Sequence, residues 1–515
     1  MNRYPLGIQT FEEIRKNNQY YVDKTDLIYN IVKGSQSNFL NRPRRFGKSL
    51  LVTTMQAYFE GKKDLFKGLA IEKLEKEWMK YPVIHLDLSR GKYYEIQVVH
   101  STLNAVLGFY EAKLGITVAE GTTYGTRLDE IIQTTAAQTG QKVVVLIDEY
   151  DAPMLDSNAK PELQEQIRSI MRDFFSPLKA NEGLLRFVFL TGITKFSQLS
   201  IFSELNNIKN YSLDDEYGAI CGFTQEEILS TFHEGIHEMA KANGLTIEQT
   251  VAKMKEQYDG YRFTPHCPNI YNPYSVLNAL HDKKFSNYWF ATGTPTFLLE
   301  LLIKNDIEMP QLEGIVATED QFDSPTDNIG NPIPVLYQSG YLTIKDYDEG
   351  IYTLGYPNEE VRMGLNRSML NYIAPQYGLK TTAFAAQFRA AMRKDDIDTA
   401  MKVLQSFLAT FPYDIHHNRE DYFQAILFTI FITLGFTIHA EVKTARGRID
   451  LLISTKTTIF VMELKIDQSA AKALEQIDAK DYTLPYKHDG RRIFKVGINF
   501  STEKRTVDEW RYEEA

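Results

Sequence analysis

Residues 41–51 read NRPRRFGKSLL, and this stretch decides how the first half of the chain is interpreted. Its end, Gly47-Lys48-Ser49, matches the end of a phosphate-binding loop. In such a loop backbone N–H groups and a helix N-terminus surround phosphate oxygens, the lysine neutralises them and the hydroxyl holds Mg²⁺. Arg42 stands where a glycine is usual. The competing interpretation is a basic loop that caps a helix, because GKS alone is common by chance.

The segments around this loop predict a parallel sheet. SNFLN at 37–41 is short and apolar enough for a buried strand, and 48–61 has helical spacing that ends at a glycine. Apolar strand patterns recur further along, and helical patterns lie between them. Strands that alternate with helices indicate a parallel sheet covered on both faces. The further strands are expected at 81–89, 143–148 and 184–194, and the helices at 95–114, 127–138 and 161–180.

A pair of acids at the end of the predicted strand VVVLIDEYD, residues 143–151, is the second part of the nucleotide signal. In a P-loop ATPase the first acid, here Asp148, holds Mg²⁺ with the loop hydroxyl, and the next, Glu149, polarises the attacking water. The alternative is a strand with a solvated acidic end. A loop and an acid pair on ordered strands, about 100 residues apart, favour an ATP site with Mg²⁺. In LTGITK, Thr191 or Thr194 is expected near the γ-phosphate, or else forms a simple turn.

Several stretches together resemble the bacterial and archaeal AAA-ATPase-like family over about 5–300. They are YYVDKTDLIYNIV, LNRPRRFGKSLLVTTMQAYFEG, LFKGLAI, VVVLIDEYDAPM, LTGITKFSQLSIFSELNNI, GFTQEEI and YNPYSVLNAL. In that family RPRRFGKSL is the habitual form of the Walker A loop, so the resemblance implies a working loop. The ATP contacts it implies are Arg42, Pro43, Arg44, Arg45, Phe46, Gly47, Lys48, Ser49 and Thr191.

The roles of several arginines stay open at this point. Arg44 and Arg45 either contact the nucleotide or brace the loop against the sheet. Arg186 and Arg262 are candidates for an arginine finger or are surface charges. Without such a finger, turnover would be slow or would depend on a partner.

The middle of the chain changes character. Helices and tyrosine-rich turns at 206–305 predict a helical lid, and 335–358 alternates around a turn, which predicts a β-hairpin. Together with the helices before it, the hairpin suggests a winged-helix-like region within 306–404 that binds DNA or another copy. Four tyrosines of the lid either stack on single-stranded nucleic acid or pack in its core. They are Tyr258, Tyr261, Tyr271 and Tyr274.

GRIDLLISTKTTIFVMELK at 447–465 carries the second chemical signal. Glu463 and Lys465 are two apart on a predicted strand and project from one face, opposite the strand that Asp450 opens. Two carboxylates, with the Leu464 carbonyl, suit Mg²⁺, and a lysine beside them suits phosphodiester hydrolysis. The alternative is a charged strand edge. Charges directly after the apolar run TIFVM favour a site.

The pattern of this block predicts a helix at 419–436, strands at 436–444, 447–455 and 458–466, a helix at 469–486 and a strand at 491–500. This order over 405–515 resembles a PD-(D/E)xK nuclease domain, a restriction-endonuclease-like α/β fold. The resemblance implies Asp450, Glu463 and Lys465 as the nuclease residues, and Gln476 and Tyr482 as supports from the following helix. The tyrosine lies six residues after the glutamine rather than four, which leaves the helix roles open. Further candidates are Glu420 or Glu441 as an extra acid, and Lys443, Arg446 and Arg448 for DNA, all of them alternatively solvated loop or surface charges.

Composition limits the remaining possibilities. The 515 residues suggest two to four domains, and the net charge of −10 excludes general attraction to nucleic acid. The block 401–515 is neutral, with 16 basic and 16 acidic residues. Cys221 and Cys267 are too far apart in sequence for a metal motif and fit a reducing cytoplasm. The start lacks a secretory signal, and the apolar run 425–436 is too short to span a bilayer.

The expected architecture is therefore α/β throughout. The boundaries are 1–205 for a P-loop core, 206–305 for a helical lid, 306–404 for a linker or winged-helix-like region and 405–515 for a nuclease-like domain. The expected function is a cytoplasmic ATPase coupled to a Mg²⁺-dependent DNA nuclease, and a homo-oligomer is one expected assembly. The alternative is a nucleotide-controlled switch or scaffold whose C-terminal domain binds DNA or protein without cutting.

Overall fold

A computed structural model gives the fold in two compact units. One comprises Met1–Thr292 with Gly314–Glu360, and the other comprises Gly293–Glu313 with Val361–Ala515. The boundaries expected at 305 and 404 therefore do not coincide with those of the units. The structure describes residues 3–515 except 158–159, 196–207, 291–295, 306, 308, 327–330, 374–377, 409–436, 445–446, 456 and 505.

The first unit is built on the parallel sheet that the sequence predicted. Its strand order is β2-β3-β4-β1-β5, and all four pairings are parallel. Every residue of β3 is buried, as its continuous apolar run requires. The strands are β1 (Ser37–Asn41), β2 (Val83–Asp87), β3 (Val143–Asp148), β4 (Leu185–Gly192) and β5 (Lys209–Asn210).

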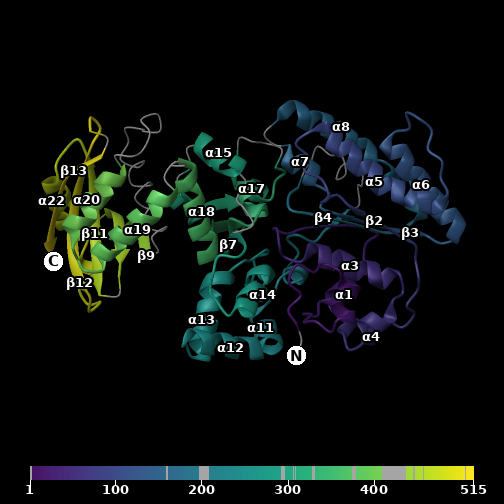
Figure 1. The fold of residues 1–515 in the computed structure, drawn as a ribbon, viewed down its shortest axis with the longest axis horizontal. Coiled ribbons are helices and arrows are strands. Elements are labelled where there is room, and N and C mark those ends of the chain that lie inside the picture. Colours follow the sequence, from purple (N-terminus) through teal and green to yellow (C-terminus); the bar gives the residue numbers. More distant parts are fainter. Residues whose placement is uncertain are drawn as a thin grey trace. The chain divides into compact units, whose positions relative to one another are not determined.

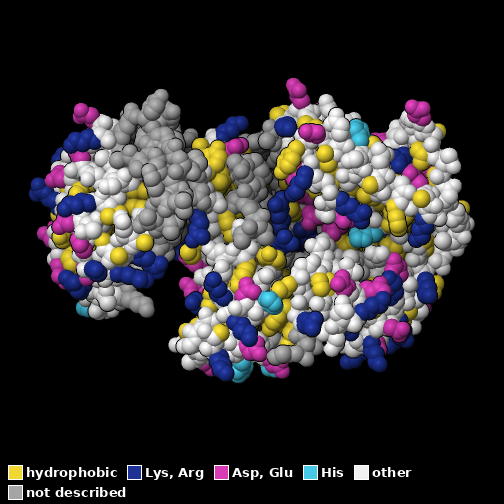
Figure 2. All heavy atoms as spheres, in the orientation of Figure 1, with side chains coloured by type: hydrophobic (Ala, Val, Ile, Leu, Met, Phe, Trp, Pro, Cys, Tyr) yellow, Lys and Arg dark blue, Asp and Glu magenta, His cyan; other side chains and the backbone are white. Residues whose placement is uncertain are grey.

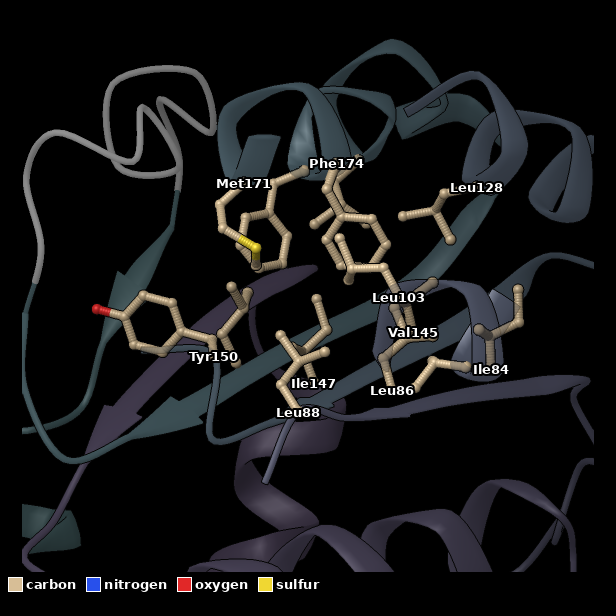
Figure 3. Close-up of a cluster of buried hydrophobic side chains, with 14 of the residues drawn as sticks. Ile84, Leu86, Leu88, Leu103, Leu128, Val145, Ile147, Tyr150, Met171 and Phe174 are labelled. Carbon is tan, nitrogen blue, oxygen red and sulfur yellow. The ribbon is translucent and has the colours of Figure 1, made fainter. Parts of the chain in front are cut away.

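Helices cover both faces of this sheet (Figure 1). One face carries α5 (Ile96–Leu114), α6 (Tyr124–Thr139) and α8 (Pro161–Phe175), and the other carries α3 (Lys48–Phe59). The first face forms the core of Figure 3, where Val145 and Ile147 of β3 meet side chains of the covering helices. The shorter helices are α1 (Phe11–Lys16), α2 (Thr25–Lys33), α4 (Ala70–Leu74), α7 (Ala152–Asp156) and α9 (Pro177–Ala180).

The predicted lid is helical and has its own core. Thr224 and Thr246 begin two of its helices with capping boxes, which satisfy the free N–H groups of the first turn. Tyr258, Tyr261 and Tyr271 are fully buried, so these tyrosines pack in the core and are not available to stack on nucleic acid. The lid helices are α11 (Gln225–Thr231), α12 (His233–Asn243), α13 (Ile247–Tyr258) and α14 (Pro273–Asp282).

A small antiparallel sheet of order β6-β8-β7 completes the first unit, where the winged-helix-like region was expected. Its strands are β6 (Ile315–Thr318), β7 (Thr343–Asp348) and β8 (Ile351–Gly355), and the helices α16 (Glu319–Phe322) and α17 (Ile333–Gln338) lie between β6 and β7 in the sequence. The hairpin is confirmed, but its expected beginning at 335–338 was wrong. Those residues end α17, where Pro334 lies in the first turn, a position that favours a helix start.

The second unit contains a five-stranded mixed sheet of order β13-β12-β11-β10-β9. Only β11 and β12 run parallel, and α22 (Ala470–Ala479) connects them. The strands are β9 (Thr437–Thr444), β10 (Gly447–Ser454), β11 (Thr458–Ile466), β12 (Arg492–Ser501) and β13 (Thr506–Glu514). The helices are α15 (Thr296–Lys304), α19 (Gly378–Met392), α20 (Ile397–Leu408) and α18 (Glu359–Ile373), whose first two residues belong to the first unit.

The predicted strand order of this unit is confirmed, with one strand missed. The sequence did not predict β13, because TVDEWRYEE is rich in charge and lies at a sheet edge. The predicted helix at 419–436, with the apolar run 425–436, lies outside the described residues. No helix among the described residues combines the length and apolar character that crossing a membrane requires.

Candidate functional site

The basic loop after β1 leads directly into a helix. Gly47 has φ = 93°, a left-handed conformation that favours glycine, and α3 begins at the next residue. The free N–H groups of the first turn of α3 therefore follow the loop. Lys48 is buried, and its Nζ lies 3.3 Å from the carbonyl oxygen of Pro43. This is the local geometry by which a helix N-terminus and a lysine surround an anion.

The acids at the end of β3 lie beside this loop. Glu149 Oε1 lies 3.2 Å from Lys48 Nζ, and the Ser49 side chain is close enough to the Asp148 carboxyl to lower its pKa. Burial, together with the charge of Glu149, raises the pKa of Asp148 to about 7, although Ser49 and Lys48 oppose the rise. The structure thus brings together the lysine, the hydroxyl and both acids that the sequence singled out.

A cavity of about 510 Å³ opens in front of these residues. Its size falls in the range of small-molecule pockets. The lining includes cationic side chains of the loop and apolar side chains from the N-terminal segment and from α14, such as Ile8 and Leu277. The residues of the loop and the β3 end that line it are Arg44, Arg45, Phe46, Gly47, Lys48, Ser49 and Glu149. Such a lining suits a molecule that carries both phosphate groups and an apolar group.

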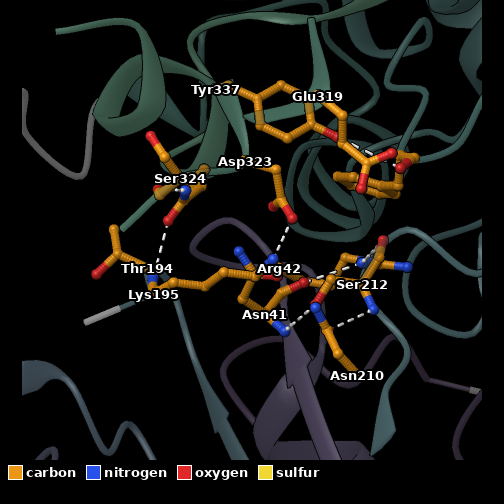
Figure 4. Close-up of polar contacts among 12 residues, drawn as sticks. Asn41, Arg42, Thr194, Lys195, Asn210, Ser212, Glu319, Asp323, Ser324 and Tyr337 are labelled. Atoms are coloured by element: carbon orange, nitrogen blue, oxygen red, sulfur yellow. Dashed lines mark hydrogen bonds and ion pairs between the residues drawn. The ribbon is translucent and has the colours of Figure 1, made fainter. Parts of the chain in front are cut away.

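The arginines of the loop separate into different environments. Arg42 is buried, and its guanidinium donates to the carbonyl oxygens of Asn41 and Ser212, both at 2.9 Å (Figure 4). It also donates to the Tyr217 carbonyl oxygen at 3.1 Å. It also stacks over the Phe263 ring at 4.3 Å. The structure therefore does not bring the Arg42 side chain to the cavity, where the sequence had placed it.

Arg44 and Arg45 are exposed and line the cavity. The Arg45 guanidinium lies 4.8 Å from the ring centroid of Tyr274, a residue of α14. Phe46 is buried between the rings of Tyr261 and Phe263, which fixes the loop against the lid. Pro43 is not among the lining residues, so its contribution is the carbonyl beside Lys48.

The threonines after β4 make contacts inside the protein. Thr191 Oγ1 donates to the Leu40 carbonyl at 2.7 Å, and Thr194 Oγ1 donates to Asp151 Oδ2 at 2.9 Å. Neither lines the cavity. The sequence interpretation missed Asp151, whose signal was the third acid of DEYD. Asp151 Oδ2 also accepts the backbone N–H groups of Ile193 and Thr194, at 2.9 and 2.7 Å.

Neither candidate arginine finger reaches the cavity within this chain. Arg186 donates to the Val32 carbonyl at 3.2 Å, and Arg262 donates to the Lys345 carbonyl at 3.3 Å. Both are absent from the cavity lining. A stabilising cation from elsewhere would have to be supplied by a partner or by another residue.

The second unit brings the predicted nuclease residues together at the ends of β10 and β11. Leu451 pairs with Met462, and one step further in this antiparallel register places Asp450 opposite Glu463. Asp450 Oδ2 accepts the backbone N–H of Leu464 at 2.8 Å. Lys465 Nζ lies 2.9 Å from Glu463 Oε1 and 2.9 Å from the Leu464 carbonyl oxygen.

Two carboxylates and a carbonyl form the donor set of this second site. Within the described residues no three His, Cys, Asp or Glu side chains gather as a metal cluster. Asp450, Glu463 and the Leu464 carbonyl nevertheless fit Mg²⁺, which prefers oxygen ligands and keeps several waters. Glu463 is 1% exposed and its ammonium partner only 12%, so both charges are desolvated.

The candidate supports of this site differ in role. Tyr482 is buried, and its hydroxyl accepts the Arg448 backbone N–H at 3.2 Å, which anchors the start of β10. Gln476 lies half-buried on α22. The side chains of Glu441 and Lys443 on β9, and the whole of Glu420 and Arg446, lie outside the described residues. Basic and acidic side chains are interspersed on this unit in the view of Figure 2, so DNA contact would depend on local placement.

Comparisons with known proteins identify both parts of the chain. A family model described as "Predicted AAA-ATPase" matches residues 5–202, and one described as "PD-(D/E)XK nuclease superfamily" matches 418–510. An uncharacterized protein in the vnfD 5' region of Azotobacter chroococcum mcd 1 is 32% identical over 517 residues, which is 98% of each chain.

Solved structures give weaker similarity. The ORC2 protein of Aeropyrum pernix is 10% identical over 67% of this chain and 94% of its own, with a TM-score of 0.27. The ORC1 protein of Aeropyrum pernix in complex with DNA is 9% identical over 66% and 90%, with a TM-score of 0.24. TM-scores at this level do not establish a common fold.

Proposed function

The chain belongs to the predicted AAA-ATPase family and carries a C-terminal domain of the PD-(D/E)XK nuclease superfamily, and on this premise we propose that it is an ATPase coupled to a metal-dependent DNA nuclease. The observation that carries the first half is that Lys48, Ser49 and Glu149 line the cavity, with Asp148 buried beside Ser49. Both cysteines are free and buried, which supports a reducing cytoplasmic location.

In the proposed ATP site each residue has a separate task. Lys48 and the first turn of α3 bind the phosphates, and Ser49 and Asp148 are the residues that would hold Mg²⁺. The ion would neutralise phosphate charge when bound. Glu149 would orient the attacking water and accept its proton. Because Glu149 is paired with Lys48, an incoming phosphate competes for the lysine and releases the carboxylate.

In the proposed nuclease site Asp450, Glu463 and the Leu464 carbonyl would hold the metal ion. That ion would activate water and stabilise the charge that develops on the scissile phosphate. Lys465 lies against the same oxygens, so its ammonium is placed to neutralise a phosphate that arrives there. The Leu464 backbone N–H orients Asp450 toward this point.

A second candidate function is a nucleotide-controlled switch or scaffold that turns over slowly. The positions of Arg186 and Arg262, both off the cavity lining, favour it. ATP binding with negligible hydrolysis, unaffected by Glu149→Gln, is the result that would select this candidate.

The proposed function is tested with wild type, Lys48→Ala and Asp450→Ala, and with Lys63→Ala as an exposed lysine control. ATP turnover and cleavage of single-stranded, duplex and branched DNA are measured with Mg²⁺ and with Mn²⁺. We expect Lys48→Ala to lose turnover and Asp450→Ala to lose cleavage, while the control behaves as wild type. Wild-type protein that neither hydrolyses ATP nor cuts DNA would contradict the proposal.

A further inference from the structure

Residues 315–355, here called the wing module, pack one helix into the first unit. Pro334, Val335, Leu336, Tyr337 and Gln338 of α17 are all buried. The turn of the hairpin, by contrast, exposes acidic side chains, Asp346, Asp348 and Glu349. An acidic turn repels a phosphate backbone, so this hairpin is not suited to bind DNA. The buried helix directs attention to what the module contacts inside the unit.

The wing module binds Lys195, which lies three residues after the end of β4. The backbone N–H of Lys195 donates to Gln338 Oε1 at 2.8 Å, and its carbonyl accepts the N–H of Thr326 at 2.9 Å. The Lys195 ammonium forms an ion pair with Asp323 (Figure 4). Both side chains are nearly buried, with exposures of 13% and 9%. Main chain and side chain of Lys195 are thus both held by the wing module.

Asp323 also faces the arginine at the start of the phosphate loop. Arg42 and Asp323 attract each other electrostatically, and Figure 4 shows the Asp323 carboxylate above Arg42 and Lys195. Burial raises the pKa of Asp323, while Lys195 and Arg42 counteract the rise. The carboxylate of Asp323 is therefore paired with Lys195, after β4, and lies on the side of Arg42, after β1. A buried charge without its partner is strongly unfavourable.

The same end of β4 contacts residues 148–151 at the end of β3, here called the acidic turn of the ATP site. Asp151 binds Ile193 and Thr194, as described above, and the Tyr150 hydroxyl donates to the Thr194 carbonyl at 2.8 Å. Glu149 is the neighbour of Tyr150 and lines the cavity. Only one peptide bond separates Thr194, bound by the acidic turn, from Lys195, bound by the wing module.

The junction contains unsatisfied atoms that permit a second arrangement. Arg42 Nε and Asp323 Oδ1 are buried without a hydrogen-bond partner among the described residues. Each unpaired buried polar atom is costly, so an arrangement that gave either atom a partner would be favoured. Gly340 of the wing module also approaches the loop so closely that a Cβ on it would lie 2.7 Å from Pro43 Cβ. A movement of the loop would therefore reach the wing module directly.

We propose that Asp323 is a positioning residue for ATP hydrolysis, and that through Lys195 and Arg42 the wing module sets the position of Glu149 and senses the occupancy of the phosphate loop. The inference rests on the proposed ATPase function. Asp323 does not line the cavity, so it acts through Lys195 and not on the nucleotide. A ligand or partner that moved the wing module would then change turnover without touching the ATP site.

The test compares Asp323→Asn, Lys195→Met and the double variant with wild type, and uses Asp346→Asn as an exposed acid control from the same module. Steady-state kcat and KM for ATP are measured with thermal unfolding of each protein. We expect each single variant to lose about tenfold in kcat with KM within about twofold. The double variant removes both buried charges and should regain thermal stability while its kcat stays low.

Two results would overturn the inference. One is wild-type kcat in the folded single variants, and the other is a double variant that regains kcat together with stability, since the ion pair would then serve folding alone. Hydrogen exchange of the peptides in 315–355 supplies a readout that needs only ATP binding. ATP should slow exchange there in wild type but not in Asp323→Asn, and no effect in wild type counts against the inference. Failure of the ATPase proposal is distinguishable, because it appears as absent turnover in wild type.

Discussion

The carboxylate of Asp151 accepts the backbone N–H of Thr194 at 2.7 Å and its hydroxyl at 2.9 Å, and so ties the end of β3 to the end of β4. The neighbouring Gly192 makes this contact possible, because a Cβ on residue 192 would lie 2.2 Å from Asp151 Oδ1. The geometry of the acidic turn thus depends on a glycine of another strand.

Gly192→Ala is therefore expected to destabilise the first unit. The added methyl group must displace a buried carboxylate, which costs roughly 1–3 kcal/mol of unfolding free energy. Gly183→Ala is the matched control, since a Cβ there meets nothing within 4 Å. Urea unfolding measures both. Equal unfolding free energies for the two variants would contradict the close packing described here.

Substitutions of the loop arginines are expected to affect different properties, either stability or ATP binding. Arg42→Met removes a buried cation from three carbonyls and from Asp323, and should lower the unfolding free energy by roughly 3 kcal/mol. Arg44→Gln should leave stability unchanged and weaken ATP binding about tenfold, because it removes a charge at the cavity wall. Thermal unfolding and calorimetric titration with ATP distinguish the two. A large stability loss in Arg44→Gln would show that both arginines brace the fold.

Glu360 predicts a pH dependence of stability in the first unit. It is buried and accepts the Ser275 hydroxyl at 2.7 Å and the Trp289 N–H at 2.8 Å. Burial raises its pKa from 4.5 to about 7. Between these values the folded state holds a proton that the unfolded state has released, so this contribution to stability is complete below the unfolded pKa and is lost as the pH rises through about 7.

Glu360→Gln should flatten this dependence. Urea unfolding at about pH 5 and about pH 8 should show wild type losing up to ~3 kcal/mol more than the variant over the interval. Asp148 and Asp151 also have raised pKa values, of about 7 and about 6, but they are present in both proteins and cancel in the comparison. The same pH slope in both proteins would show that Glu360 is ionised when folded.

The nuclease site predicts separate effects on metal binding and on cleavage. Asp450→Asn and Glu463→Gln each remove a carboxylate ligand and should weaken Mn²⁺ binding at least about tenfold. Lys465→Met should abolish cleavage without weakening Mn²⁺ binding, since its ammonium lies against Glu463 Oε1 and competes for it. Asp489→Asn, an exposed acid of the same domain, is the control. Calorimetric titration with Mn²⁺ gives the affinities, and unchanged affinity in Glu463→Gln would place the metal elsewhere.

Much of the fold could be predicted from the local pattern of apolar and polar residues in the sequence. Apolar runs predicted the strands of the parallel sheet, and the carboxyl ends of parallel strands share one edge, so Ser49 and Asp148 were expected to meet. The pair Glu463 and Lys465 followed from the two-residue period of a strand. The missed strand β13 is a charged edge strand, whose packing on one face leaves little apolar signal.

The role of Arg42 could not be predicted from its neighbours in sequence. An arginine in a phosphate loop suggests a phosphate contact, but the guanidinium binds the carbonyls of Ser212 and Tyr217, far along the chain. Asp151 and Asp323 were missed for the same reason, because their partners are brought close only by the fold. Such contacts satisfy buried polar groups, and they leave no periodic trace in the sequence.

The most direct test of the central claim is phosphate release from ATP by wild type and by Glu149→Gln, measured together with ATP affinity. Lys48 and Glu149 form one side of the proposed site, and only the lysine is assigned to binding. We predict that Glu149→Gln binds ATP at least as tightly as wild type but hydrolyses it about 10²–10⁴-fold more slowly. Equal turnover by the two proteins, or no ATP binding by wild type, would contradict the account.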